Sequence, residues 1–298
     1  EPNLFEVRRF YPKGRPVNYV VPSAYFGEAK QELFNELLDH AFLSWPMLIP
    51  PTDWSEETAG GYLSNEVMHM HDMVRRGCPT IQGEAIYKFL NKIQKTSFTL
   101  NKFVVDVAEQ LEKKGRSVGK FIPATDLLDL PNKPLDIDTN EEAKKDYKRR
   151  RRDVENRNRI HTQKCVRTRM TMECVRRFVV HDKFYLPWSY DYRGRCYPVA
   201  AFLTPQDTDF GKSLLRFYQE SFVDETAIDW LKFHVATQFG LDKAPIKERI
   251  KWTEDNEELI TKIATHPIEN QHEWEVADEP WQFLAACEEY YACVISCT

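Results

Sequence analysis

Two arginines and a glycine stand together in a short polar segment, Asp191-Tyr192-Arg193-Gly194-Arg195. An arginine fork binds a phosphate group through two hydrogen bonds, and a nearby carboxylate orients such a fork by ion pairing. We expect Asp191 to orient one of the two arginines and Gly194 to let the backbone turn. The segment therefore indicates a clamp for nucleic acid, with an Asp–Arg pair that only holds a turn as the alternative.

Aromatic-rich, strand-like segments flank this turn at residues 184–190 and 196–202. They predict a hairpin that carries the arginines at its turn. Tyr192 and Tyr197 add aromatic faces of the kind on which nucleic-acid bases stack.

A strongly basic segment precedes the hairpin. Residues 143–177 contain 14 Lys and Arg against 4 Asp and Glu, although the whole chain has a formal net charge of -5. Thr139 and Glu142 form a predicted capping box that begins a helix. Side chains at spacings of three and four share one face of this helix: Lys145, Arg149, Arg152, Asn156, Arg159, Gln163 and Arg167. A helix with one cationic face is well shaped to follow a phosphate backbone.

Other interpretations of the basic face stay open. A charged helix face is often merely solvated, but the four consecutive arginines at 149–152 repel one another, which favours a polyanionic partner. A basic arm on an acidic body could also bind an acidic protein, and that interpretation predicts no salt-sensitive binding of DNA or RNA. Further along the helix, an apolar row is expected to pack on the body: Val166, Met170, Cys174 and Phe178.

The remaining pattern is mostly helical. Apolar residues at spacings of three and four predict one long helix over 82–114. Prolines mark 121–138 as a linker or domain boundary. Further helices are expected at 24–42, 209–219, 226–239, 246–266 and 280–294. Together with the strand-like segments, this predicts an α+β, predominantly helical fold.

Length and composition narrow the class of protein. A chain of 298 residues should form two or three packed units, and the lack of an apolar run of about 18 residues argues against a membrane protein. Seven cysteines without a CxxC pair indicate reduced thiols. His69, His71 and Cys78 fall short of a tetrahedral metal site, so no metal ligand is predicted. Both ends of the chain are expected to be cuts in a longer protein.

Residues 187–199 closely resemble the DxxGR motif region of the single-subunit RNA polymerases of T-odd-like bacteriophages and mitochondria. One such motif would be weak, but the resemblance continues in the same order along the chain. The downstream segments are 204–215, 229–234, 249–251 and 267–270, and the upstream ones are 50–51, 60–62 and 133–138.

The resemblance implies a right-hand architecture of thumb, palm and fingers. Residues 1–122 would be the distal part of an N-terminal promoter and template domain, 123–177 a basic helical thumb, and 178–298 the start of the palm with an inserted helical module. Arg193 and Arg195 would then contact the template or the RNA–DNA hybrid.

Within that architecture, Gly194 would give close approach to the nucleic acid and Asp191 would orient the arginines. Gly60, Gly61 and Tyr62 match a segment near the template path.

The implied reaction is DNA-directed RNA synthesis from nucleoside triphosphates on promoter DNA, with two Mg²⁺ ions held by palm aspartates. Those aspartates are expected beyond Thr298, so no catalytic or metal-binding residue is predicted here, and Asp207 and Asp209 fall outside the metal-binding motifs. The piece by itself is expected to be inactive.

The parent protein is expected to be a monomer in the cytoplasm of a phage-infected bacterium, with the mitochondrion as the alternative. The alternative function is that of a non-catalytic nucleic-acid-binding protein that keeps only the clamp. The reading frame beyond Thr298 would distinguish the two functions.

Overall fold

The computed structural model describes residues 5–11, 16–23, 44–56, 60–63, 83–123, 127–134, 137–191 and 193–296. The chain divides into two compact units, Glu1–Leu43 and Ser44–Thr298. In the first unit, β1 (Phe5–Phe10) and β2 (Val17–Pro22) pair as an antiparallel hairpin, with Val7 opposite Val20. The helix expected at 24–42 lies outside the described residues.

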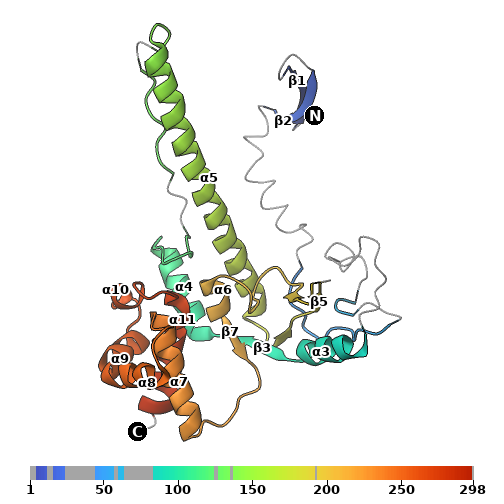
Figure 1. Cartoon of the computed structure of the whole chain (residues 1–298), viewed down its shortest axis with the longest axis vertical. Coiled ribbons are helices and arrows are strands. Elements are labelled where there is room, and N and C mark those ends of the chain that lie inside the picture. The colour runs from blue at the N-terminus through green and yellow to red at the C-terminus, as the bar shows by residue number, and fades with distance from the viewer. Residues whose placement is uncertain are drawn as a thin grey trace. The chain divides into compact units, whose positions relative to one another are not determined.

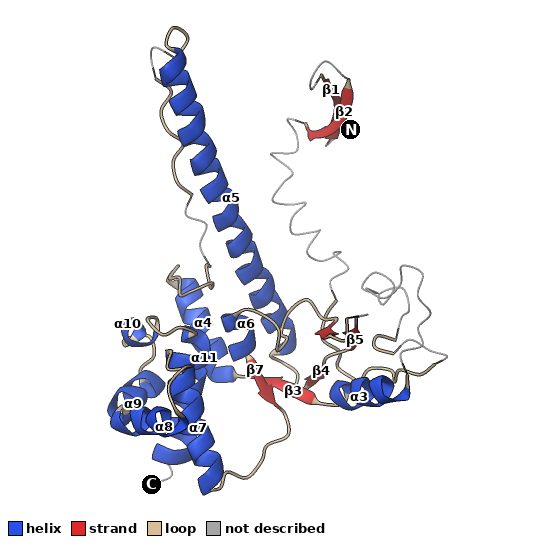
Figure 2. Cartoon of the chain, in the orientation of Figure 1, coloured by secondary structure: helices blue, strands red, loops and turns tan. Residues whose placement is uncertain are grey.

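The second unit is largely helical and contains short strands, as Figure 2 shows. This agrees with the predicted α+β class. Among the described residues, none of the helices combines the length and the apolar character that crossing a bilayer requires.

The long helix predicted over 82–114 is wrong as a single element. The segment forms α3 (Glu84–Gln94), β3 (Ser97–Leu100) and α4 (Lys102–Lys113). The Asn101 side chain accepts a hydrogen bond from the Val104 N–H and so begins α4 anew. Tertiary packing explains the break, because the Phe98 ring stacks against the rings of Phe184 and Phe217 on the two neighbouring strands.

The basic segment forms one helix of 38 residues, α5 (Glu141–Phe178). Its N-cap is Asn140, whose side chain accepts from the N–H groups of Glu142 and Ala143, so the predicted cap at Thr139 was wrong by one residue. Figure 1 shows the first part of α5 extending away from the other helices of its unit.

The two parts of α5 differ in burial. Residues 141–164, here the tip half, include no buried residue, whereas 165–178, here the root, pack on the body. The expected apolar row is confirmed at Cys174 and Phe178, which are buried, while Val166 and Met170 are half-buried. The proline-rich segment runs beside the tip half, because Leu128 exchanges two hydrogen bonds with the Asn158 side chain (2.9 and 2.8 Å).

Two small sheets follow α5. The first has the order β4–β3–β7, with β4 at Phe184–Tyr185 and β7 at Leu215–Phe217, and both pair antiparallel to β3. The second is the hairpin of β5 (Trp188–Tyr190) and β6 (Cys196–Pro198). The segment predicted at 184–190 therefore divides into β4 and β5, which belong to different sheets, and the one predicted at 196–202 is a strand only at its start, as β6. The helix predicted at 209–219 ends early, as α6 (Asp209–Ser213), because the chain then joins β3 as β7.

Helices form the rest of the unit. The prediction at 226–239 is confirmed by α7 (Glu225–Phe239), whereas the one at 246–266 divides at Asn256 into α8 (Ile246–Asp255) and α9 (Glu257–Thr265). After the short α10 (Gln271–Trp274) come α11 (Pro280–Tyr290) and a π-helical turn (Tyr291–Ile295).

An aromatic core joins α6, α11 and the segment after α4. The Trp281 ring lies 4.7 Å from the Phe210 ring and 5.0 Å from the Phe121 ring, and all three side chains are buried. The root of α5 lies beside this core, because the Thr168 hydroxyl accepts a hydrogen bond from the Ile122 N–H (3.0 Å) in the segment after α4.

Candidate nucleic-acid interface

The hairpin predicted around the two arginines is present, with Tyr190 opposite Cys196. Two backbone hydrogen bonds close its turn: the Asp191 N–H donates to the Arg195 carbonyl (2.9 Å) and the Gly194 N–H donates to the Asp191 carbonyl (3.0 Å). Gly194 has a φ of 83°, which favours glycine. The sequence therefore identified both the turn and the residue that permits it.

Asp191 holds one of the arginines in place. Its side chain is 2% exposed, and its Oδ2 accepts from Arg193 Nε (2.8 Å) and Nη2 (2.7 Å). Its Oδ1 accepts from the backbone N–H groups of Arg193 (2.9 Å) and Arg195 (3.0 Å). Burial by itself raises the pKa of Asp191, but these hydrogen bonds and the charge of Arg193 outweigh it, so the pKa lies below its ordinary value. The ionised carboxylate therefore orients the Arg193 fork before any ligand arrives.

The second arginine has a different environment. Arg195 is exposed, and its guanidinium makes no hydrogen bond or ion pair with another residue in the described part of the chain. Tyr197 is half-buried, and its hydroxyl accepts from Arg193 Nη2 (3.3 Å). Tyr192 lies outside the described residues. The turn thus presents one oriented and one exposed guanidinium.

Gly60 packs against a tryptophan, and Gly61 pairs with a neighbouring backbone segment. A Cβ on Gly60 would lie 2.5 Å from Trp54 Cδ1, and Gly61 has a φ of 100°. Gly61 also exchanges two backbone hydrogen bonds with Thr52, each 2.8 Å long. Tyr62 donates its hydroxyl to the Trp45 carbonyl, and burial raises its pKa. Gly60 thus approaches Trp54 closely, and a contact of this segment with template stays a prediction.

A buried glutamine connects that segment to the hairpin. Gln94 is fully buried, and its Oε1 accepts from Trp54 Nε1 (3.2 Å) and from the Trp188 N–H (3.2 Å). Its Nε2 donates to the Thr52 carbonyl (3.2 Å). Sequence reasoning missed Gln94 and Trp54, because no local pattern links residues 40 and 94 positions apart.

Most of the predicted basic face is exposed on the tip half of α5, namely Lys145, Arg149, Arg152 and Arg159. Arg149 pairs with Asp146 (2.7 Å) and Arg150 pairs with the same carboxylate. These two arginines hold the pKa of Asp146 below its ordinary value, chiefly through the hydrogen bond from Arg150. Within the described chain, Lys145, Arg152 and Arg159 have no ion pair, so they present their charges to solvent.

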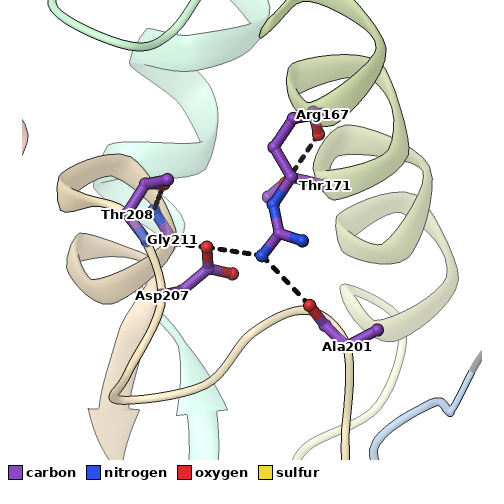
Figure 3. Close-up of polar contacts among 6 residues, drawn as sticks. All are labelled: Arg167, Thr171, Ala201, Asp207, Thr208 and Gly211. Atoms are coloured by element: carbon purple, nitrogen blue, oxygen red, sulfur yellow. Dashed lines mark hydrogen bonds and ion pairs between the residues drawn. The ribbon is translucent and has the colours of Figure 1, made fainter. Parts of the chain in front are cut away.

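Arg167, the last residue of the predicted face, makes contacts of another kind. Its Nη2 donates to Asp207 Oδ1 (2.7 Å) and to the Ala201 carbonyl (3.0 Å), and its guanidinium lies 4.5 Å from the centre of the Phe202 ring. Figure 3 shows the side chain reaching from α5 across to the loop before α6. The basic face is therefore exposed along the tip half and engaged with protein at the root.

Asp207 and Asp209, the two carboxylates outside the metal-binding motifs, both make contacts within the protein. Asp209 accepts hydrogen bonds from the N–H groups of Trp281 and Gln282 at the start of α11, and its burial raises its pKa. In the described part of the chain, no group of three or more His, Cys, Asp and Glu could hold a metal ion. His69, His71 and Cys78 lie outside that part.

Known proteins are similar to the chain over most of its length. The family described as DNA-dependent RNA polymerase matches residues 221–297, from before α7 into the C-terminal segment. T7 RNA polymerase of Escherichia phage T7 is 34% identical over 252 residues, which are 82% of this chain and 28% of the phage protein. The DNA-directed RNA polymerase of Enterobacteria phage T3 is 31% identical over 253 residues, with the same two shares.

An organellar protein is similar over the same extent. The mitochondrial DNA-directed RNA polymerase 1 of Arabidopsis thaliana is 29% identical over 252 residues, which are 81% of this chain and 25% of that protein. The chain thus spans about a quarter of the length of the curated relatives it matches.

Proposed function

We propose that this chain is part of a single-subunit DNA-directed RNA polymerase and that the whole protein synthesises RNA on a DNA template from nucleoside triphosphates. The observation that carries the proposal is the hairpin in which buried Asp191 orients Arg193 while Arg195 stays exposed. An oriented guanidinium beside an exposed one suits a phosphate backbone, because the ordering of the first fork is complete before binding.

The part of the enzyme proposed for this chain is the one that holds nucleic acid. In a right-hand polymerase architecture, residues 1–122 would belong to the N-terminal domain, 123–177 to the thumb and 178–298 to the early palm. The 38-residue helix α5, whose basic tip half contains no buried residue, supports the thumb assignment. The RNA–DNA hybrid would lie along Lys145, Arg149, Arg152 and Arg159, and the template or hybrid would meet Arg193 and Arg195.

The proposal extends to the cofactor and the partners of the whole protein. Nucleic-acid polymerases use divalent metal ions, and we propose Mg²⁺ here. The described residues do not fit such an ion, because Asp207 accepts from Arg167 and Asp209 accepts from the backbone of α11. We therefore assign no step through a metal to this part of the protein.

We propose that the whole protein is a monomer that binds promoter DNA and nucleoside triphosphates. Because the two phage relatives are 34% and 31% identical and the Arabidopsis one is 29% identical, we propose the cytoplasm of a phage-infected bacterium as the site of action.

A hybrid-binding measurement tests the proposed role of the turn. The full chain would be titrated against a fluorescent RNA–DNA hybrid at several salt concentrations, and anisotropy would give the affinity. Arg195→Ala should weaken binding about tenfold and lower the log–log salt slope by about one, because the variant no longer neutralises one phosphate. Lys247→Ala, which removes an exposed charge on α8, is the matched control and should change neither quantity.

The outcome also distinguishes the structural role of the turn from a binding role. If Arg195→Ala unfolds the chain in a thermal melt, the arginine serves the turn and the binding proposal is wrong. Nucleic-acid binding without polymerisation is the second candidate function, favoured by a site built of phosphate-binding side chains. An RNA-extension assay on the full-length product of the gene distinguishes the two candidate functions.

A further inference from the structure

The root of α5 is tied to the loop between β6 and α6 by a buried carboxylate. The Asp207 side chain is 1% exposed, whereas the Arg167 side chain that binds it is 42% exposed. Besides Arg167, Asp207 Oδ1 accepts from the Thr208 N–H (2.6 Å). A buried carboxylate is tolerated only with a close cationic or hydrogen-bonding partner. The contact therefore restricts the position of Arg167 relative to Asp207.

Close packing around Asp207 restricts the position of its carboxylate further. A Cβ on Gly211 would lie 2.4 Å from Asp207 Cγ and 2.6 Å from its Oδ2. The carboxylate therefore packs directly on the backbone of α6. Because Thr208 caps the same helix by accepting from the Gly211 N–H (3.2 Å), the position of Asp207 is set by α6 itself, as Figure 3 shows.

The loop that carries the contact is itself held in one conformation. The Ala201 carbonyl accepts from Arg167, and the Ala201 N–H donates to the Ser44 carbonyl (2.8 Å). Leu203 is fully buried and has a φ of 55°, a left-handed conformation that persists where the surrounding packing holds it. Asp209, the first residue of α6, accepts from the N–H groups of Trp281 and Gln282 at the start of α11. The loop and the first residue of α6 together connect the root of α5 to α11.

We propose that the Arg167–Asp207 pair, seated on Gly211, is a positioning device that sets the direction in which the basic tip half of α5 leaves the body. This inference deepens the proposed function and rests on it, because the direction of α5 decides whether its basic face meets the hybrid held at the hairpin. Arg167 is then a positioning residue and not a phosphate contact.

The test measures the direction of α5 and hybrid binding in the same full-length chain. Spin labels would be attached through an azide-bearing residue at Asp153 on α5 and at Lys247 on α8, both exposed. Pulsed dipolar spectroscopy would give the distribution of distances between the labels. A fluorescent RNA–DNA hybrid would give affinity and salt slope in the unlabelled variants, and a thermal melt would check folding.

Three substitutions distinguish a positioning role from a direct contact. Asp207→Asn keeps the size of the side chain, and Gly211→Ala displaces the carboxylate without changing any charge. Both should widen the distance distribution and weaken hybrid binding about fivefold with the salt slope unchanged. Arg167→Gln should do the same, and combining it with Asp207→Asn should add little, because both remove one contact.

A direct phosphate contact predicts the opposite sign for one variant. Asp207→Asn would then release the charge of Arg167 and tighten binding, and Arg167→Gln would lower the salt slope by about one. That result, or an unchanged distance distribution in Asp207→Asn and Gly211→Ala, would overturn the proposal. If the parent chain binds no hybrid while the distances still widen, the proposed function fails and the positioning of α5 by this pair stands.

Discussion

The tip half and the root of α5 belong to one uninterrupted helix and both carry arginines on the predicted basic face, yet the surroundings of these arginines differ. Arg152 and Arg159 in the tip half are exposed, while Arg167 in the root reaches a carboxylate that is 1% exposed. The root also contains Cys165, Met172 and Cys174, each at most 1% exposed. The comparison teaches that an arginine on a regular face acquires its role from what packs beside it.

The largest expected effect is a loss of stability that distinguishes the packed root of α5 from its exposed tip half. Met172→Ala in the root should lower the free energy of unfolding by about 3 kcal/mol, because it leaves a cavity under a fully buried side chain. Ile160→Ala in the tip half should change it by less than about 0.5 kcal/mol, since Ile160 is 48% exposed. Urea unfolding followed by tryptophan fluorescence measures both. Equal losses in the two variants would show that the tip half is packed in solution.

The next effect concerns the charges of the tip half. Replacing the four arginines at 149–152 by alanine should lower the salt slope of hybrid binding by about one for each phosphate that the arginines neutralise in the parent chain. Stability should change little, because these side chains are exposed. The measurement is anisotropy with a labelled hybrid across a salt series, with Lys247→Ala as the control. An unchanged slope would remove the tip half from the interface.

The smallest effect is a pH dependence at the tip. Because Arg150 and Arg149 hold the pKa of Asp146 below its ordinary value, their pairing contributes stability above the unfolded pKa of about 3.9. The contribution is lost as pH falls through the lower folded pKa. A carboxyl NMR titration should therefore find Asp146 titrating below its ordinary range, and Arg149→Gln with Arg150→Gln should return it there. A midpoint at the ordinary value in the parent chain would argue that the pairs do not persist in solution.

Local patterns in the sequence predicted the elements that depend on neighbouring residues. The turn at Asp191 to Arg195 was predictable because a glycine, a carboxylate and two arginines within five positions specify it, and α5 was predictable because its basic face repeats at helical spacing. The division between α3 and α4 was not predictable, since an apolar period of three and four continues through the residues that become β3. In β3, Phe98 pairs with residues of two strands that follow it by more than 80 residues in the sequence.

The sequence by itself determined a charge distribution, a turn that orients one arginine and a similarity to a family of polymerases. These follow from residue types at short spacing, where geometry leaves few choices. Only the tertiary structure decided that Gly60 meets Trp54, that Gln94 joins two distant segments, and that Arg167 binds Asp207. The physical reason is that burial changes what a side chain does. An arginine in water is solvated and free to change conformation, whereas an arginine paired with a buried carboxylate is held in one conformation.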